Sequence, residues 1–260
     1  MAKIFITGSS DGLGLLAAKE LVSTGHRVVL HARNKDRAKS AIKEVPGAES
    51  IVIGDLSGLE DTKRLADQVN ALGNFNAIIH NAGIYHVPVH AKSRDGLPLL
   101  FAVNSLAPYI LTALIHRPER LIYLSSGLHR QGNADVERLN AVLKSQNFPN
   151  YSDTKLHDLL LAFAVARKWP EVSSNAVDPG WVPTKMGGSG APGNLKEGYT
   201  TQVWLAAGDD DEAKRSGRYL HHQQEMNFNP QAGSKKIQDK FLEICEALSG
   251  VDFDGLTSAG

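Results

Sequence analysis

A tyrosine and a lysine stand four positions apart in residues 151–155, which read YSDTK. On a helix, side chains four positions apart share one face, with Cβ atoms roughly 5–6 Å apart, so Tyr151 and Lys155 can act on one small volume. Lowering a phenol pKa from about 10 toward 7 needs about 4 kcal/mol, and an ammonium ~4 Å away supplies energy of that order. The pair therefore indicates a proton donor and acceptor. The alternative is a core tyrosine beside a lysine whose stem covers apolar surface.

A glycine-rich loop near the start of the chain connects a short apolar strand to an alanine-rich helical stretch. It contains Gly8, Gly12 and Gly14. Gly8 permits a sharp turn, Gly12 lets the backbone approach a pyrophosphate, and Gly14 allows close packing of helix on strand. The free N–H groups at the helix start would face the anion. The loop predicts a dinucleotide site, with an ordinary tight turn as the alternative.

A basic residue follows the second predicted strand, where an NAD-binding fold places an acidic one to bind the ribose hydroxyls. Arg33 has the planar, permanently charged guanidinium that matches a phosphate. We therefore expect Arg33 to bind the 2′-phosphate of NADP. The alternative is a solvated arginine beside the helix cap at residues 34–36.

Short β-branched runs alternate with helical stretches, which is typical of strand–helix–strand units in a parallel sheet. We predict seven strands, at residues 3–7, 27–31, 50–54, 76–80, 120–125, 172–177 and 218–221. Right-handed crossovers between them give one doubly wound, Rossmann-type α/β domain over residues 1–260. Its seven-stranded parallel sheet has helices on both faces, and its ligand crevice lies at the carboxyl ends of the strands.

Polar residues follow several of these strands. Asp55 follows the third, Asn81 and Gly83 follow the fourth, and Ser126 follows the fifth, while Asn104 lies on the intervening helix. Taken singly, Asp55 could cap a helix, and Asn81 with Gly83 could form a turn.

Together these motifs resemble the short-chain dehydrogenase/reductase family. The matching residues, in order from residue 3 to about 184, are Thr7-Gly8-x-x-x-Gly12-x-Gly14, Asn81-Ala82-Gly83, Asn104, Ser126, Tyr151-x-x-x-Lys155 and Asp178-Pro179-Gly180. The resemblance implies that Tyr151 is the general acid or base of hydride transfer, and that Lys155 lowers its pKa and binds the nicotinamide ribose. It also implies that Ser126 orients the substrate oxygen and that Asn104 supports a proton-relay water. We choose Ser126 over Ser125 because the second serine of such a pair resembles the family's catalytic one.

The same resemblance implies the cofactor contacts, with Asp55 beside the adenine, Asn81 near the adenosine ribose, and Pro179, Gly180 and Thr184 against the nicotinamide carboxamide. The full implied set is Gly8, Ser10, Gly12, Leu13, Gly14, Arg33, Asp55, Leu56, Asn81, Ala82, Gly83, Tyr151, Lys155, Pro179, Gly180 and Thr184. Members that use NADP often carry a basic residue in the glycine loop, where this chain has Ser10. Arg33 then bears more of the discrimination, and we expect NADP(H) to be preferred over NAD(H).

The span between Ser126 and Tyr151 is longer than in the commonest members and looks like that of the retinol-dehydrogenase-like and related ketoreductase branches. Residues 133–138 suggest a helix within it. Residues 185–193 are rich in glycine, and we expect a substrate lid over residues 185–200, with a loose surface loop as the alternative. Trp181, Met186, Tyr85 and His129 could line an apolar substrate pocket.

Composition narrows the class of partner. The formal net charge is zero, and no apolar run reaches the length of a membrane span, so we expect neither a nucleic-acid nor a membrane partner. The single cysteine, Cys245, falls in a predicted C-terminal helix and suits a reducing cytoplasm. The ten histidines show no metal-ligand spacing, and His221 and His222 would point to opposite faces of a strand, so we predict no metal.

The sequence leaves the oligomeric state open between a homodimer and a monomer. The stripe of Leu156, Leu159, Leu160, Phe163 and Ala164 on the predicted helix 151–168 is core in the simplest interpretation. In the family, this helix and the Asn104 helix commonly pair in a twofold dimer, which implies a possible homodimer. Pro108 would kink the second helix and disturb that pairing, so a monomer stays open. Residues 248–260 are expected to be a C-terminal tail.

Three functions are compatible with the motifs. The first is an NADP-dependent carbonyl reductase or alcohol dehydrogenase acting on a small molecule. The second is a non-catalytic NAD(P)-binding redox sensor of the same fold, which would need no tuned phenol. The third, a sugar-nucleotide epimerase or dehydratase, usually needs a larger C-terminal substrate domain. The complete set of Asn104, Ser126, Tyr151 and Lys155 favours the first.

Overall fold

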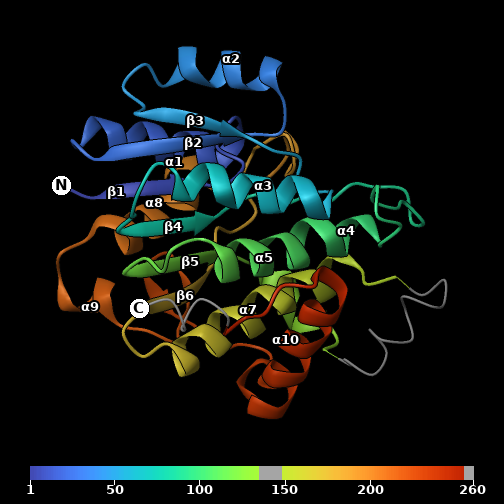
Figure 1. Ribbon diagram of the computed structural model, residues 1–260. Coiled ribbons are helices and arrows are strands. Elements are labelled where there is room, and N and C mark those ends of the chain that lie inside the picture. The colour runs from blue at the N-terminus through green and yellow to red at the C-terminus, as the bar shows by residue number, and fades with distance from the viewer. Residues whose placement is uncertain (135–147, 255–260) are drawn as a thin grey trace.

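A computed structural model describes residues 1–134 and 148–254, and one eight-stranded sheet runs through it (Figure 1). The strand order is β3-β2-β1-β4-β5-β6-β7-β8. The strands are β1 (Lys3–Ile6), β2 (Arg27–Ala32), β3 (Ser50–Ile53), β4 (Ala77–His80), β5 (Arg120–Leu124), β6 (Ser173–Asp178), β7 (Tyr219–His221) and β8 (Gln224–Glu225). All neighbours pair in parallel except β7 and β8. The doubly wound α/β prediction is confirmed.

The prediction of seven strands is wrong, because β8 pairs antiparallel with β7 at the sheet edge. The turn between them uses His222 and Gln223 at φ values of 49° and 62°, a backbone region that glycine normally occupies. A two-residue polar strand after a turn without glycine carries no sequence signal. His222 consequently lies outside the strand, and its ring stacks on that of His221 at 3.8 Å instead of pointing to the opposite face.

Helices cover both faces of the sheet. The larger helices on one face are α1 (Gly12–Ser23), α2 (Lys35–Glu44) and α8 (Leu195–Ala207). Those on the other are α3 (Leu59–Asn70), α5 (Ala107–Leu114) and α7 (Tyr151–Lys168), which lie toward the viewer in Figure 1. The shorter segments are α4 (Leu99–Phe101), α9 (Asp211–Lys214), a π-helical segment (Ala102–Leu106) and 3-10 helices at Gly127–Gln131 and Pro230–Gly233.

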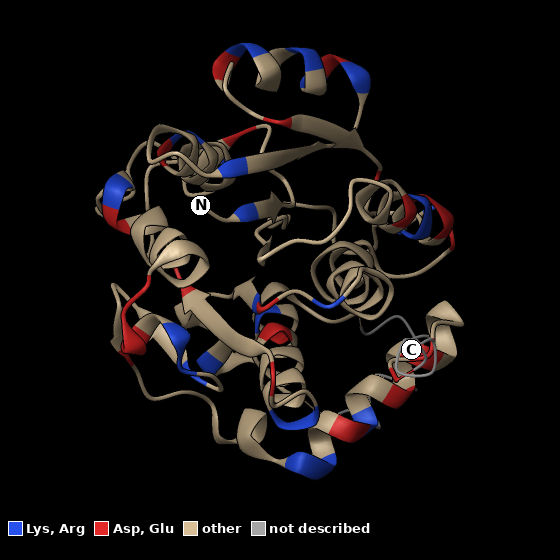
Figure 2. Ribbon diagram, turned by 60° about the vertical axis from the view of Figure 1, so that its left-hand side comes forward, with Lys and Arg blue, Asp and Glu red and all other residues tan. Residues whose placement is uncertain are grey.

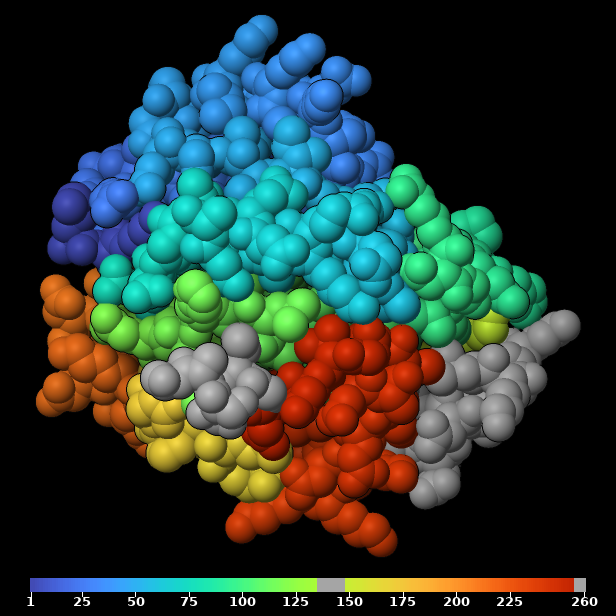
Figure 3. All heavy atoms as spheres, viewed as in Figure 1, coloured from blue at the N-terminus to red at the C-terminus, as the bar shows by residue number. Residues whose placement is uncertain are grey.

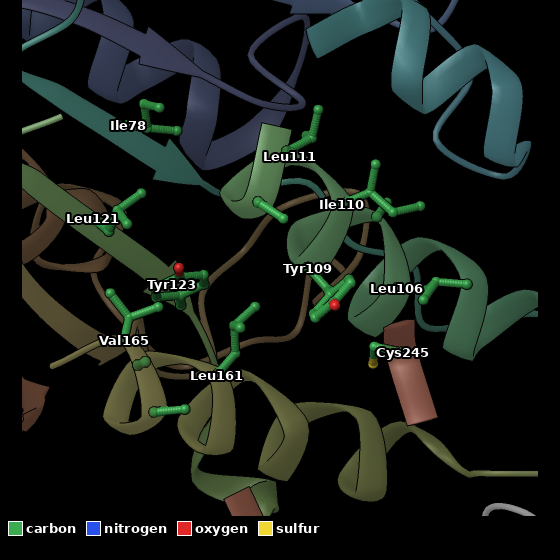
Figure 4. Packing of buried hydrophobic residues seen from close by; sticks show 14 of the residues in the cluster. Ile78, Leu106, Tyr109, Ile110, Leu111, Leu121, Tyr123, Leu161, Val165 and Cys245 are labelled. Carbon is green, nitrogen blue, oxygen red and sulfur yellow. The ribbon is translucent and has the colours of Figure 1, made fainter. Parts of the chain in front are cut away.

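The larger hydrophobic core lies between the sheet and helices α5 and α7. Figure 4 shows Tyr109 and Leu111 of α5 and Leu161 of α7 filling the space in front of Ile78 and Tyr123 on the strands. The apolar stripe expected on residues 151–168 is buried there, and the α7 bounds match the predicted ones. This packing fixes α7, which carries Tyr151 and Lys155, against the sheet.

The last helix, α10 (Lys235–Ser249), packs on the outer side of α7 (Figure 3). The ring of Phe241 stacks on His157 at 4.9 Å, and Gln238 accepts a hydrogen bond of 3.1 Å from Arg167. Cys245 is a buried free thiol on this helix. After α10, Phe253 stacks on Trp169 at 4.9 Å. Val251 and Phe253 of the expected tail are thus buried, its first two residues end α10, and residues 255–260 lie outside the described residues.

Charged residues of both signs alternate along the outer helices in Figure 2, for example on α2, α3 and α10. In the ranges that the structure describes, no helix is long and apolar enough to cross a membrane.

Candidate active site

A cleft of about 750 Å³ lies at the carboxyl ends of the parallel strands, where the sheet topology predicts it. Predicted residues that line it are Gly8, Ser10, Gly12, Leu13, Arg33, Asp55, Leu56, Asn81, Ala82, Gly83, Tyr151, Lys155, Pro179 and Thr184. The fold thus brings together residues that are separated by up to 176 positions in the chain.

The glycine loop is shaped by close backbone approaches. A Cβ on Gly8 would lie 2.8 Å from the Cα of Ala82, and one on Gly14 would lie 2.4 Å from Nδ2 of Asn81. Gly12 has a φ of 56° and open space around it at the start of α1. Gly14 and the Asn81 amide therefore act in packing, since Asn81 Nδ2 donates to the carbonyls of Thr7 and Gly8 at 3.0 and 3.3 Å.

Two arginines lie near the end of β2. Arg33 is exposed at the strand end, and Arg37 follows in the first turn of α2, where its backbone N–H donates to the Asn34 cap at 3.0 Å. Both line the cleft. Arg37 approaches Asp11 of the glycine loop, with 3.8 Å between Nη1 and Oδ2. Arg37 was not predicted; its position in the first turn of the helix that follows β2 is the signal that could have identified it.

His31 supports the same end of the cleft from beneath. Its Nδ1 accepts a hydrogen bond of 2.9 Å from the Gly8 amide, and its Nε2 contacts the Gly54 carbonyl at 2.9 Å. Burial lowers the pKa of His31 to about 4, so the ring is neutral at pH 7 and can accept from Gly8. His31 was also absent from the predicted set.

Asn104 does not line the cleft directly. Its Oδ1 accepts from the Ile84 amide at 2.8 Å, and its Nδ2 donates to the Ile84 carbonyl at 2.9 Å and to Thr154 Oγ1 at 3.1 Å. The side chain therefore ties the loop after β4 to α7. Pro108 has no N–H for the Asn104 carbonyl four residues earlier, and the π-helical segment Ala102–Leu106 occurs at this point.

Tyr151 begins α7, where Asn150 and Asp153 form a capping box. Its ring packs on that of Tyr85, with 4.4 Å between centroids. Burial raises the pKa of the Tyr151 phenol, and the charge of Lys155 lowers it without reversing the direction. Lys155 thus acts in the expected direction, but desolvation outweighs its attraction, so the phenol pKa lies above its usual value in this structure.

Lys155 is buried one turn below Tyr151, with its Nζ 5.6 Å from the tyrosine ring centroid. The ammonium donates to the Leu124 carbonyl at 2.7 Å and to Asp158 Oδ2 at 2.9 Å. Burial alone would lower the pKa of Lys155, but the Asp158 carboxylate raises it above its usual value. Lys155 is thus held as a cation next to the cleft. Asp158 was not predicted, although a carboxylate within an apolar helical run is a visible signal.

The two serines after β5 differ in position. Ser125 is buried, lines the cleft and donates to the Lys155 carbonyl at 2.7 Å. Ser126 is half-buried, is not among the lining residues, and its Oγ accepts from the Leu128 amide at 3.2 Å. Its hydroxyl caps the 3-10 helix in this structure, so the predicted role of Ser126 toward substrate rests on the family resemblance alone.

The segment after β6 forms the far wall. Gly180 has a φ of 77°, and its amide donates to Asp178 Oδ1 at 2.9 Å. Pro179 and Thr184 line the cleft, whereas Gly180 does not. Residues 185–194 contain no helix or strand, and residues 195–200 of the expected lid form the first turns of α8.

The mouth of the cleft is apolar and aromatic. Tyr85 and Met186 line it and are 40% and 38% exposed. Trp181 lies further out, 64% exposed, with its indole N–H donating to the Gly187 carbonyl at 2.8 Å. His129, in contrast, is buried behind the cleft, where its Nδ1 contacts the Ser126 carbonyl at 2.7 Å. An apolar ligand could enter the cleft past Tyr85 and Met186.

Within residues 1–134 and 148–254, no group of three or more His, Cys, Asp or Glu side chains is arranged to hold a metal ion. The helix suggested over residues 133–138 falls mostly outside the described residues.

Comparison with known sequences gives a consistent result. The short chain dehydrogenase family profile matches residues 2–193. The chain is 45% identical to an uncharacterized oxidoreductase of Emericella nidulans, over 98% of this chain and 100% of that protein. It is 40% identical to the short-chain dehydrogenase chyC of Penicillium rubens, over 96% and 98% of the two chains. Mouse retinol dehydrogenase 14 is 27% identical, over 95% and 86%.

Solved structures show the same fold. A protein from Mycobacterium paratuberculosis superimposes with a TM-score of 0.82 at 24% identity, covering 97% of this chain and 95% of that chain. A blue fluorescent protein from a metagenomic library, solved in complex with NADPH, gives a TM-score of 0.67 at 20% identity, covering 85% and 95%.

Proposed function

Because this chain belongs to the short-chain dehydrogenase/reductase family, in its retinol-dehydrogenase-like branch, and is an oxidoreductase, we propose that it transfers a hydride between NADP(H) and a carbonyl compound or alcohol. Tyr151 is the general acid of reduction and the general base of oxidation. The observation that carries this proposal is the placement of Tyr151 directly above the buried Lys155 ammonium, at the mouth of a cleft that the glycine loop closes at its other end.

The residues present fit a dinucleotide. A side chain at Gly8 would collide with Ala82, and one at Gly14 would collide with Asn81, so these glycines let the loop pack closely on the segment after β4. The space around Gly12 is open. The amides at the start of α1 would bind the pyrophosphate. Asp55, Leu56 and Asn81 would bind the adenosine, and Pro179, Gly180 and Thr184 the carboxamide. When bound, NADPH supplies the hydride.

NADP(H) is the proposed choice over NAD(H) because two cations lie where the adenosine ribose would project. Arg33 and Arg37 both line the cleft near the end of β2. A planar guanidinium can form two charge-assisted hydrogen bonds to a phosphate. The loop carries no further cation at Ser10, so the selectivity rests on these two arginines.

In the proposed reaction, the side chains of the protein transfer one proton and stabilise the charge that its transfer leaves. In reduction, Tyr151 Oη donates its proton to the carbonyl oxygen as hydride reaches the carbonyl carbon. Lys155 stabilises the resulting phenolate. Ser126 would orient the substrate oxygen by donating its O–H, because its Oγ only accepts from the Leu128 amide. Both N–H donors of the Asn104 side chain are used, and its Oδ1 already accepts from Ile84. Its support of a proton-relay water would therefore come from its backbone carbonyl, which Pro108 leaves without an α-helical donor.

The test is NADPH oxidation against a panel of ketones, aldehydes, quinones and polyketide-like carbonyls. The Tyr151→Phe variant should lose about 10²–10⁴-fold in kcat on every compound that the wild type reduces, because it removes the proton donor. NADPH affinity should stay within a few-fold. Tyr199→Phe, on α8 outside the cleft, is the matched control and should behave as wild type. Equal rates for wild type and Tyr151→Phe would refute the proton-donor role.

A further inference from the structure

The chemistry proposed above makes no use of Asp158, the buried partner of Lys155. The two side chains are 4% and 6% exposed, and 2.9 Å separates Asp158 Oδ2 from Lys155 Nζ. Removing two charges from water costs several kcal/mol per ion before their attraction repays it, so a buried pair is weak support for stability as such. The pair also determines how strongly Lys155 can stabilise the neighbouring Tyr151 phenolate.

Asp158 and Tyr151 lie seven residues apart on α7, which is nearly two helical turns, so they share one face with ~10 Å of rise between them. Lys155 lies between the two. The phenol therefore faces an ammonium whose charge is partly offset by a carboxylate on its far side. Such a pair stabilises a phenolate less than a lone cation does, because the more distant carboxylate subtracts part of the attraction.

Other ionisable groups add to the same effect. Tyr85, in the loop after β4, and Asp178, at the end of β6, also disfavour the Tyr151 phenolate, but Asp158 contributes the largest of these unfavourable charge interactions. On β5, Tyr123 faces Asp158. Burial raises the pKa of Asp158 while Lys155 opposes that rise, so the carboxylate and the ammonium depend on each other for their charges.

We propose that Asp158 is a positioning residue that offsets part of the charge of Lys155 and so weakens its stabilisation of the Tyr151 phenolate, which suits the site to carbonyl reduction. The inference rests on the proposed role of Tyr151. In reduction, the carbonyl π bond breaks, the carbon gains a hydride and the oxygen gains the Tyr151 proton. NADPH is oxidised to NADP⁺, and solvent returns a proton to the phenolate. Oxidation of an alcohol needs the phenolate at the start and is therefore confined to higher pH.

The experiment measures the Tyr151 pKa by the ultraviolet difference absorbance of phenolate as pH rises. The chain has six tyrosines, so each titration is taken as the difference from a matched protein that carries Tyr151→Phe. In Asp158→Asn, which keeps an oxygen acceptor for Lys155, the Tyr151 pKa should fall by about one pH unit over the pH range in which Lys155 stays protonated. A unit charge ~10 Å away produces a shift of this size at an effective dielectric constant of about 20.

Two controls separate charge from structure. Asp158→Ala should shift the pKa in the same direction, so misfolding of one variant leaves the test intact. Asp67→Asn removes an exposed carboxylate on α3 and should leave the Tyr151 pKa unchanged. An unchanged Tyr151 pKa in a folded Asp158 variant, or an equal shift in Asp67→Asn, overturns the inference.

Steady-state turnover of the same variants is then measured over a range of pH. The alkaline limb of kcat/KM for carbonyl reduction should move down by the same pH interval in Asp158→Asn, and alcohol oxidation should begin at correspondingly lower pH. A purely structural role would lower rates without moving the limbs. Because the phenol titration needs no substrate, a failed substrate screen leaves it standing, and an unchanged titration rejects the role of Asp158 even in an active reductase.

Discussion

Lys185 donates a hydrogen bond of 2.5 Å to the carboxylate of Asp11, 174 positions away in the chain. The contact joins the start of the 185–194 segment to the glycine loop, across the cleft between them. Asp11 also caps α1 by accepting from the Gly12 amide at 2.8 Å. The segment proposed as a lid is therefore fastened to the loop proposed to bind the pyrophosphate.

Removing this contact should loosen the cleft. Lys185 is exposed, and such ion pairs contribute roughly 0.2–1 kcal/mol, so Lys185→Ala should raise the NADPH dissociation rate by at most about fivefold. Stopped-flow fluorescence measures that rate. The difference from wild type should shrink at high salt, because exposed charges are screened. Lys196→Ala, an exposed change on α8, serves as the control. A rate difference that is insensitive to salt would show that the ion pair is not its cause.

Cofactor preference should depend on the two arginines. Arg33→Asp is expected to weaken NADPH binding by about 10–100-fold, the loss of a charge-assisted hydrogen bond, while NADH binding changes little. Arg37→Ala should act in the same direction. Dissociation constants from fluorescence titration with both cofactors provide the comparison, and Lys39→Asp, exposed on α2, is the control. Equal losses for NADPH and NADH would show that neither arginine reads the 2′-phosphate.

Gly14 offers a test of packing in the glycine loop. An alanine in a helix interior is normally favoured over glycine by about 1 kcal/mol, yet here its Cβ would lie 2.4 Å from Asn81 Nδ2 and 2.9 Å from the Gly8 carbonyl. Overpacking costs about 1–3 kcal/mol, so Gly14→Ala should lower the free energy of unfolding. Urea unfolding measures it. Gly190→Ala, where no atom lies within 4 Å, should stay within about 0.5 kcal/mol of wild type. A Gly14→Ala variant as stable as wild type would contradict the packing argument.

Stability should fall in mild acid because three histidines are buried as neutral rings. Burial lowers the pKa of His31 to about 4 and those of His80 and His157 to about 3. In the unfolded chain each histidine has a pKa near 6.5. Their neutral forms thus give full stability above pH 6.5, and that contribution declines as the pH falls toward 4. Each should cost about 2 kcal/mol at pH 5 relative to pH 7.5.

Urea unfolding of wild type and His157→Gln over this pH range measures the effect. The variant should show a pH dependence smaller by about one proton. If His157→Gln keeps the full slope, His157 is not one of the groups that take up a proton on unfolding.

Much of the fold was predictable because buried parallel strands are continuous apolar runs. All seven predicted strands exist, and their bounds agree to within one or two residues. β8 was missed because Gln224 and Glu225 are polar and their turn lacks glycine. Local pattern carries no information about a pairing that only the edge of the finished sheet allows.

The site was predictable where motifs are local. Tyr151 and Lys155 lie on one helix, and the glycine loop is a continuous segment. Their spacing in the sequence was therefore enough to predict that these residues lie near one another. The sense of the Tyr151 pKa shift was not predictable, since it depends on burial and on Asp158 as well as on Lys155. The contact between Lys185 and Asp11 depends on how distant segments fold together, which no local spacing reveals.

Helix α10 gives helix α7, which carries Tyr151 and Lys155, a second support from within the same molecule. The outer side of α7, which the predicted homodimer would need, is covered by Phe241 and its neighbours, so the homodimer stays a prediction that this geometry does not favour. The sheet holds α7 from the inside and α10 holds it from the outside. Truncation before residue 235 should therefore unseat Tyr151 even though the cleft itself loses no lining residue. Helix α10, although remote from the proposed chemistry, therefore holds the proposed active site in position.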